Sequence, residues 1–267
     1  MEFQEKFPVT PRFLTAKTKR RPGLPIKEVR FIVLHDTGNP GSSANGNVRY
    51  YENTRNQESA SAHIFVDHKE IVECIPALTA PPEKAWHVRY NVPTDNQLFG
   101  ADANDAAIGI EYCYGGSIDA DEAYKRYIWT AAFICHKFKL DPKTSLVGHF
   151  FLDPRRKTDP VTGLAHSRRT YEQLLRDIAA EYEESTGAAK APEWTLAGAP
   201  GAAKAVAGLN LRQGAPNTKA PVARVVPVGM LLPFTGWVEN GQSINGNSKW
   251  YLDKEGNYFW SGGVIPA

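Results

Sequence analysis

The residues with the clearest chemical potential lie in one short stretch, residues 146–160. An apolar run leads to His149 at what reads as the end of a strand, and the chain then turns through Asp153-Pro154. It returns with Lys157 and Asp159, which point the same way if the segment is extended, because they are two residues apart. A histidine, a carboxylate and a cation that converge in a loop are the inventory of a metal-assisted hydrolase. A catalytic zinc ion needs a third protein ligand, which another part of the chain must supply.

His35 is the candidate for this third ligand, because it follows the apolar run 30–34 much as His149 follows its own. Ends of strands in open α/β sheets form the crevice in which ligands bind. Together with Asp159, the two histidines offer a nitrogen, nitrogen and oxygen set that suits one zinc ion and leaves a coordination position open for water. From spacing alone, three unrelated polar residues on loops are an equally good interpretation.

Two further side chains could take part in the same chemistry. Glu111 interrupts an apolar strand, where a carboxylate is costly unless it has a purpose or a partner, so it is the candidate general base. The competing interpretation is a glutamate on an edge strand that faces water. Lys157 could stabilise the negative charge that develops on a carbonyl oxygen, although most loop lysines are simply solvated.

The remaining histidines have weaker claims. His63 begins a strand and could line a cleft, but a structural role with hydrogen-bonded ring nitrogens is at least as good an interpretation. His68, His136 and His166 read as solvated or packed residues.

The elements that must position these residues follow from the apolar pattern. The pattern predicts a strand at 30–34 that is buried on both faces, a β-hairpin from 62–67 and 70–75, and a strand at 107–114. Apolar stripes with helical spacing predict helices at 121–140 and from Thr170 to about Glu184, the second opened by a capping box. Residues 76–100 read as a long irregular segment, and such segments are usually functional or mobile.

A change of composition divides the chain. Residues 1–186 hold the motifs above, and residues 187–207 are dominated by Ala, Gly and Pro, which is typical of a linker. Residues 208–267 contain short alternating runs broken by turns, which predict a small β-barrel.

Composition narrows the classes of protein. The hydrophobic share of 42% supports a core, and the formal net charge of +2 gives no reason to expect nucleic acid as a partner. No stretch resembles a membrane span. Three cysteines without C-x-x-C spacing argue against a disulfide framework and against a cysteine zinc site. Residues 1–8 lack the apolar segment of a signal peptide, so we expect a protein that accumulates in the cytoplasm of the cell that makes it. We also expect a monomer.

Four motifs occur in matching order in one known family: residues 32–35, residues 61–67, residues 108–111, and Gly148-His149 with the K-T-D-P run at 157–160. Over roughly residues 25–185 the chain resembles the zinc-dependent N-acetylmuramoyl-L-alanine amidases of the type-2 amidase and peptidoglycan-recognition family. The resemblance implies an α/β fold with a mixed central β-sheet flanked by helices, and a zinc ion in a groove on one face.

The resemblance also implies roles for individual residues. The positions that match the metal ligands are His35, His149 and Asp159. Glu111 matches the acid/base glutamate, and Lys157 matches the lysine that stabilises the tetrahedral intermediate. Some members have a tyrosine where this chain has Ala62, so more of the acid/base work falls on Glu111 here. The substrate-binding residues that we expect are His87, which falls near a family position lining the substrate groove, Asn39 and His63.

The implied reaction is hydrolysis of the amide bond between N-acetylmuramic acid and L-alanine in peptidoglycan. Residues 208–267 resemble a bacterial SH3-type cell-wall-binding domain, and the two-part plan resembles a phage endolysin or a host autolysin that acts on the wall after release. Two alternatives remain open. One is a peptidoglycan-binding protein without activity, and the other is a cytoplasmic amidase that recycles muropeptide fragments, for which the barrel would have no purpose.

Overall fold

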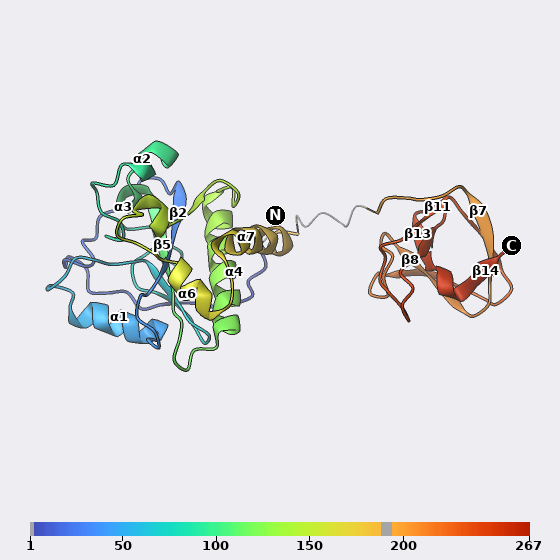
Figure 1. Ribbon diagram of the computed structural model, residues 1–267, viewed down its shortest axis with the longest axis horizontal. Helices are drawn as coiled ribbons and strands as arrows, with labels where there is room; N and C mark the ends of the chain where they lie inside the picture. Colours follow the sequence, from blue (N-terminus) through green and yellow to red (C-terminus); the bar gives the residue numbers. More distant parts are fainter. Residues whose placement is uncertain (1–2, 188–193) are drawn as a thin grey trace. The chain divides into compact units, whose positions relative to one another are not determined.

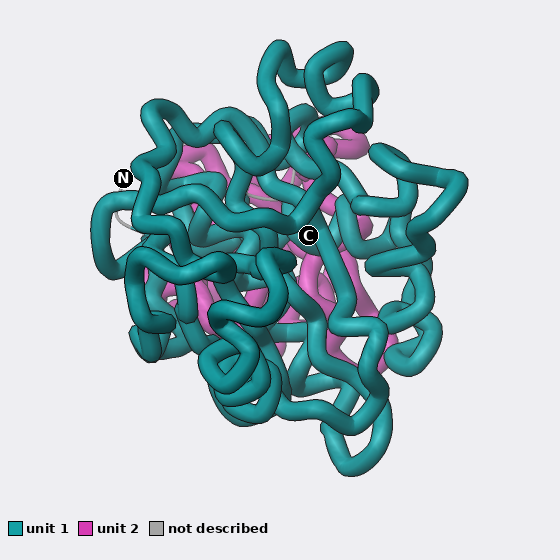
Figure 2. The backbone as a smooth tube through the Cα atoms, turned by 90° about the vertical axis from the view of Figure 1, so that its left-hand side faces the viewer, with its two compact units in different colours: residues 1–189 teal, residues 190–267 magenta. Residues whose placement is uncertain are grey.

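The chain forms two compact units, residues 1–189 and residues 190–267 (Figure 2). The computed structural model describes residues 3–187 and 194–267. Each unit has hydrophobic clusters of its own. None of the helices within these two ranges combines the length and the apolar composition that a membrane crossing needs.

The first unit is built on a six-stranded sheet with the order β1-β4-β3-β5-β2-β6. The strands are β1 (Val9–Pro11), β2 (Phe31–Asp36), β3 (Ile64–Val66), β4 (Ile71–Glu73), β5 (Ala107–Tyr112) and β6 (Leu146–Gly148). β3 and β4 pair antiparallel, as the predicted hairpin requires, whereas the other neighbours in the sheet pair parallel. The sheet is therefore mixed, which confirms the expected fold class.

Helices lie on both sides of this sheet (Figure 1). They are α1 (Ala44–Asn53), α2 (Thr94–Phe99), α3 (Ala103–Ala106), α4 (Ala120–Phe138), α5 (His149–Leu152), α6 (Val161–His166) and α7 (Tyr171–Ser185). The two long helices, α4 and α7, are close to those predicted, and the Thr170 side chain caps α7 by accepting a hydrogen bond from the Gln173 amide. In Figure 1 they lie on one side of β2 and β5, with α1, α2 and α3 on the other.

Alternation along β2 assigns its side chains to these two sides. Ile32 and Leu34 belong to the apolar cluster that contains the buried residues of α4 and α7. Phe31 and Val33 belong to a smaller cluster with residues of α3. Because side chains alternate along a strand, the next residue, His35, points to the same side as Phe31 and Val33. The predicted strand is thus buried on both faces, and its polar residue comes at the end of the less thickly covered face.

The second unit contains a three-stranded sheet of order β10-β7-β14 and a five-stranded sheet of order β11-β12-β13-β8-β9. Its strands are β7 (Gly201–Ala205), β8 (Leu209–Gln213), β9 (Val222–Val226), β10 (Leu231–Phe234), β11 (Gly236–Val238), β12 (Trp250–Leu252), β13 (Asn257–Trp260) and β14 (Val264–Pro266), with a 3-10 turn, η1 (Ser261–Gly263), before the last. All pairs are antiparallel, so the unit is a small β domain.

One expectation about the chain's organisation needs correction. Residues 187–207 were expected to be a linker, but β7 lies within this range and pairs with both β10 and β14. Ala203 and Ala205 are buried in the cluster of this unit, and a Cβ atom at Gly201 would lie 2.7 Å from the Phe234 ring. The small residues that suggested a linker are needed for close packing. Residues 188–193 of the same range lie outside the described residues.

This strand assignment can be tested by placing the same large side chain on its two faces. Ala203→Leu should destabilise the second unit by about 1–3 kcal/mol, because extra methylene groups in a packed core force side chains off their rotamers. The control is Lys204→Leu, on the exposed face of β7, which should change stability by less than about 0.5 kcal/mol. Thermal unfolding followed by near-ultraviolet circular dichroism measures both. Equal tolerance of the two substitutions would favour the linker interpretation.

Candidate active site

The sheet brings the predicted residues of the first unit together by strand register. In the parallel β2–β5 pair, His35 is the partner of Glu111, and in the β2–β6 pair, Leu34 is the partner of Gly148. His149 follows Gly148 directly as the first residue of α5, so it comes next to His35. Their ring centroids are 4.7 Å apart. Three adjacent strands thus deliver a histidine, a glutamate and a second histidine to one edge.

Asp159 joins the two histidines from the following loop. Its Oδ2 atom lies 2.8 Å from Nδ1 of His35 and 3.0 Å from Nδ1 of His149. One potential ligand atom from each of the three residues lies within 4.8 Å of the other two, an arrangement that could hold a metal ion. The three-residue set predicted from the sequence therefore converges at one point.

Burial and hydrogen bonding shift the pKa values of His35 and Asp159 in the directions that favour metal binding. Burial lowers the pKa of His35 to about 4, so its imidazole is neutral and has a free lone pair near pH 7. Burial alone would raise the pKa of Asp159, but the hydrogen bonds from His149 and His35 outweigh it and hold the pKa of this carboxyl well below its usual range. The set is then two imidazole nitrogens and one carboxylate oxygen, which is typical of catalytic zinc sites.

Glu111 has the properties of a proton acceptor. Burial raises the pKa of its carboxyl well above the ordinary value, and the negative charges of Asp159 and Asp36 raise it further. Its Oε2 atom is buried without a hydrogen-bond partner among the residues that the structure describes. A carboxyl group with a raised pKa and a free oxygen can accept a proton and return it.

A hollow of about 460 Å³ contains His35, His149, Asp159 and Glu111. Four side chains that line it are Thr37, His87, Glu111 and His149, and each has a buried polar atom without a partner among the described residues. Buried polar groups in folded proteins are normally hydrogen-bonded, so such a gathering indicates a place where a ligand completes the bonding.

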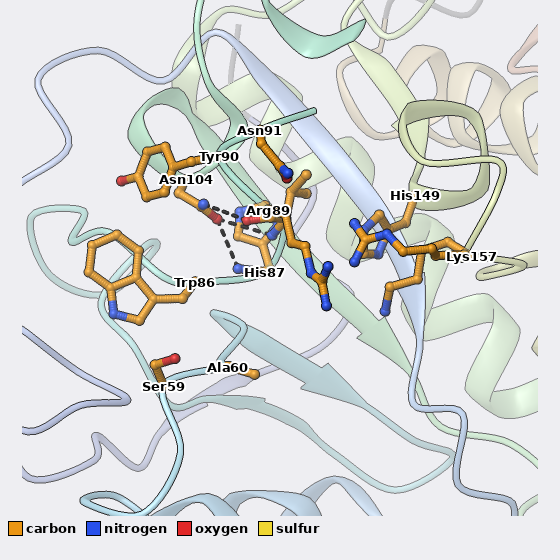
Figure 3. A pocket seen from close by; sticks show the side chains of 12 residues that line it. Ser59, Ala60, Trp86, His87, Arg89, Tyr90, Asn91, Asn104, His149 and Lys157 are labelled. Atoms are coloured by element: carbon orange, nitrogen blue, oxygen red, sulfur yellow. Dashed lines mark hydrogen bonds between the residues drawn. The ribbon is translucent and has the colours of Figure 1, made fainter. Parts of the chain in front are cut away.

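A larger groove of about 890 Å³ continues from this hollow and shares His149, His87 and Lys157 with it (Figure 3). In Figure 3 the Lys157 side chain extends beside His149. Segment 86–91, part of the long irregular stretch in the sequence, forms much of the wall. It contributes Trp86 and Tyr90, whose ring centroids are 5.9 Å apart. The groove therefore offers space for a substrate next to the hollow that contains His35.

The three expected substrate-binding residues have different surroundings. His87 lines both hollows. His63 is fully buried, with Nδ1 accepting from the Gly109 amide at 3.0 Å and Nε2 donating to the Glu83 carbonyl at 2.8 Å. Its surroundings favour the structural role that was the alternative for this histidine. Asn39 is exposed in the loop after β2 and does not line either hollow.

Supporting residues were not apparent in the sequence. The Asp36 carboxylate accepts hydrogen bonds from the amides of Gly38 and Gly163, so it ties the end of β2 to α6, just after Asp159. The Tyr127 hydroxyl on α4 donates to the backbone carbonyl of His35 at 2.9 Å. The H-D pair at residues 35–36 is a signal for Asp36 in the sequence, whereas Tyr127 is one of the residues on the apolar stripe of the predicted helix 121–140.

Comparison with known proteins gives relatives for this site. A family model described as N-acetylmuramoyl-L-alanine amidase matches residues 25–162. The N-acetylmuramoyl-L-alanine amidase BlyA of Bacillus subtilis (strain 168) is 33% identical over 167 residues, which are 60% of this chain and 44% of the relative. CwlL of Bacillus licheniformis, also an N-acetylmuramoyl-L-alanine amidase, is 32% identical over 108 residues, which are 39% of this chain and 29% of the relative. The chain thus spans less than half the length of these curated relatives.

Solved structures show the same fold. The Staphylococcus aureus hydrolase AmiA in complex with its ligand aligns with a TM-score of 0.55 at 22% identity, over 68% of this chain and 87% of that one. The catalytic domain of XlyA aligns with a TM-score of 0.51 at 23% identity, over 64% and 99% of the two chains. Since the family model covers just over half of the 267 residues, from before β2 into α6, the chain belongs to the N-acetylmuramoyl-L-alanine amidase family.

Proposed function

We propose that the protein is a zinc-dependent peptidoglycan hydrolase that cleaves the amide bond between N-acetylmuramic acid and L-alanine. The observation that supports this most directly is the convergence of His35, His149 and Asp159 beside Glu111, in a chain of this family. The groove next to these residues provides room for a polymeric substrate.

The residues present fit a zinc ion. Two imidazole Nδ1 atoms face the same carboxylate oxygen, at 2.8 and 3.0 Å, and a lowered pKa keeps the first of these imidazoles neutral. His35, His149 and Asp159 would hold the ion. A zinc ion at such a site supplies Lewis acidity, which polarises a carbonyl group and lowers the pKa of water.

The chain's own residues would divide the remaining work. Glu111 takes the proton from the attacking water, and the raised pKa of its carboxyl lets it hold that proton and pass it to the leaving amine of L-alanine. Lys157, on the loop beside His149, offers a positive charge to the oxygen that becomes negative in the tetrahedral intermediate. His87 contributes to the wall that holds the substrate, while the exposed loop position of Asn39 suits at most an outer contact.

The second unit fits a binding role. We propose that it is an SH3-like domain that attaches the enzyme to the cell wall, as the plan of an endolysin or autolysin requires. It contains antiparallel sheets and partly exposed aromatic residues such as Trp237 and Tyr251. Attachment raises the effective concentration of the catalytic unit at the polymer without changing its chemistry.

Product analysis tests the activity. Purified protein incubated with peptidoglycan should release new amino termini of L-alanine without new reducing sugar ends, as measured by amino-group labelling and mass spectrometry. Treatment with a strong chelator should abolish this release, and about one equivalent of zinc should restore it. Binding to the wall without release would favour the non-catalytic alternative, and release that survives complete metal removal would exclude the zinc mechanism.

A substitution at Glu111 tests the proton transfer. Glu111→Gln should lower kcat by about 100- to 10,000-fold, because the amide is close in shape to the carboxyl but cannot accept the proton. Zinc content and thermal stability should stay close to those of the original protein. Glu122→Gln, at a partly exposed position in the first turn of α4, is the matched control and should leave kcat unchanged. Near-normal turnover of Glu111→Gln would remove this residue from the mechanism.

Removal of the second unit tests its role. A chain that ends at residue 187 should keep its rate on small soluble muropeptides, because the groove lies within the first unit. On intact cell walls, its rate at low enzyme concentration should fall by at least about 10-fold, because the gain from tethering is lost. Parallel rate measurements on the two substrates check this. An equal loss on both would indicate that the second unit supports the fold or the chemistry instead.

A further inference from the structure

A buried arginine lies behind the groove and does not line it. Arg20 belongs to the N-terminal segment, before residue 25, at which the match to the family model begins, and only 1% of it is exposed. It lines neither the groove nor the hollow that contains His35. A buried guanidinium is costly unless its N–H groups find acceptors, so its partners show which part of the fold it holds.

All nitrogens of the Arg20 side chain donate to the loop that follows α1. Nε and Nη2 donate to Oγ1 of Thr54 at 3.0 and 2.8 Å, and Nη2 also donates to Oε2 of Glu58 at 3.0 Å. Nη1 donates to the backbone carbonyl of Ala60. The guanidinium also lies over the ring of Tyr51 on α1, 4.2 Å from the centroid. One side chain thus binds the end of α1 and the following loop at several points.

Ser59 and Ala60 depend on this contact for their position. Both line the groove, Ala60 also lines the smaller hollow, and neither is in a helix or strand. Among the residues that the structure describes, Arg20 is the only one that forms a hydrogen bond with either of them. In Figure 3 they lie across the groove from His149 and Lys157. The place of this part of the wall is therefore set by the Arg20 side chain.

The N-terminal segment also holds the neighbouring part of the wall. The Trp86 indole N–H donates to the Lys19 carbonyl at 3.1 Å, and the Trp86 backbone amide donates to Oγ of Ser61 at 3.0 Å. Nε and Nη2 of Arg21 donate to the two carboxylate oxygens of Glu83, each at 2.8 Å. The segment is thus bonded to both stretches of chain that form this side of the groove.

A gain in stability does not by itself explain these bonds. The partners of Arg20 lie at the surface, since 50% of the Glu58 side chain is exposed and Ala60 is exposed as well. A buried charge pair is often close to neutral for stability, because the loss of hydration offsets the attraction. A binding surface that is ordered before its ligand arrives loses less conformational freedom when the ligand binds. The arrangement therefore favours a role in substrate binding.

We propose that Arg20 is a positioning residue that fixes the part of the groove wall formed by Ser59 and Ala60 and thereby lowers KM. The identity of the substrate rests on the proposed function. Because Arg20 lines neither hollow, it acts through the residues that it holds, and its effect is on substrate binding and not on kcat. The groove of this chain is thus shaped in part by a segment that precedes the family match.

Spin labelling tests the attachment without any turnover. The native cysteines are buried, so a nitroxide can be attached selectively to a Ser59→Cys variant. Adding Arg20→Lys keeps a positive charge beside Glu58 but removes the planar fork that reaches Thr54, Glu58 and Ala60 together. The lines of the electron paramagnetic resonance spectrum should become narrower, because the label then moves faster. An unchanged spectrum would overturn the proposal, whether or not the protein is an amidase.

A matched control shows whether this effect is specific to Arg20. Arg55 lies in the same loop, and its Nη1 atom donates to the Glu52 carbonyl at 3.0 Å. Arg55→Lys should leave the spectrum of the label at residue 59 unchanged. Narrower lines in both variants would mean that the loop responds to any change of charge or size, which would also contradict the proposal.

Kinetics on peptidoglycan fragments test the consequence for binding. Arg20→Lys should raise KM by about 3- to 10-fold while kcat stays within about 2-fold. Thr54→Val removes an acceptor of Arg20 at a partly exposed position, so it should raise KM as well, and it provides the test if Arg20→Lys does not fold. Arg55→Lys should change neither value. An unchanged KM in the folded variants, or a fall in kcat alone, would exclude a positioning role in binding. Absence of turnover in the original protein would instead contradict the proposed function, and the spin-label result would still decide the role of Arg20.

Discussion

The site depends on one carboxylate oxygen that faces two imidazoles. Oδ2 of Asp159 lies within 3.0 Å of both His35 and His149. His35 is on β2, His149 begins α5 directly after β6, and Asp159 lies in the loop before α6. Taking such groups from water is costly unless they bond to one another. In the first unit the bonds are made at the edge of a sheet whose strands are largely apolar, so the free energy of the core offsets the cost of this polar edge.

The two faces of the sheet have different tasks. The side chains of β2 that point toward α4 and α7, Ile32 and Leu34, belong to a large apolar cluster, which extends at β3 and β4 to residues of α1. The opposite face carries a smaller cluster near α3, and beyond it the polar groups that line the two hollows. Several of these groups have unpartnered buried atoms, which is unfavourable for stability and useful for binding. The large apolar cluster can therefore offset the cost of the unpartnered polar atoms in the site.

Much of this arrangement could be predicted from the sequence, since it rests on local patterns. Apolar runs that end in His35 and His149 marked the central strands, and Glu111 was conspicuous because a carboxylate is costly within an apolar strand. The pairing of strands was less accessible. No local signal states that His35 and Glu111 are partners in register, and the resemblance to a family supplied that proximity.

Other features could not be read because they depend on neighbours distant in sequence. The contact between His87 and His35 needs the absent side chain of Gly109, a residue that within its own strand looked like an ordinary glycine. Both nitrogens of His63 are engaged by backbone groups, which only the folded chain reveals. The Ala-rich composition of β7 suggests a linker, because close packing against Phe234 cannot be recognised from composition.

Alternation along β2 and β5 carries an evolutionary consequence. Side chains alternate between the two faces of the sheet along each strand. Deletion of a single residue before Glu111 within β5 would therefore move the residues on one side of the deletion to the opposite face. The apolar Ile110 and the acidic Glu111 would then compete for opposite environments. Members of this lineage should therefore vary in length within segment 76–100 and at the surface turns, while the strand lengths that lead to the histidines and the glutamate stay constant.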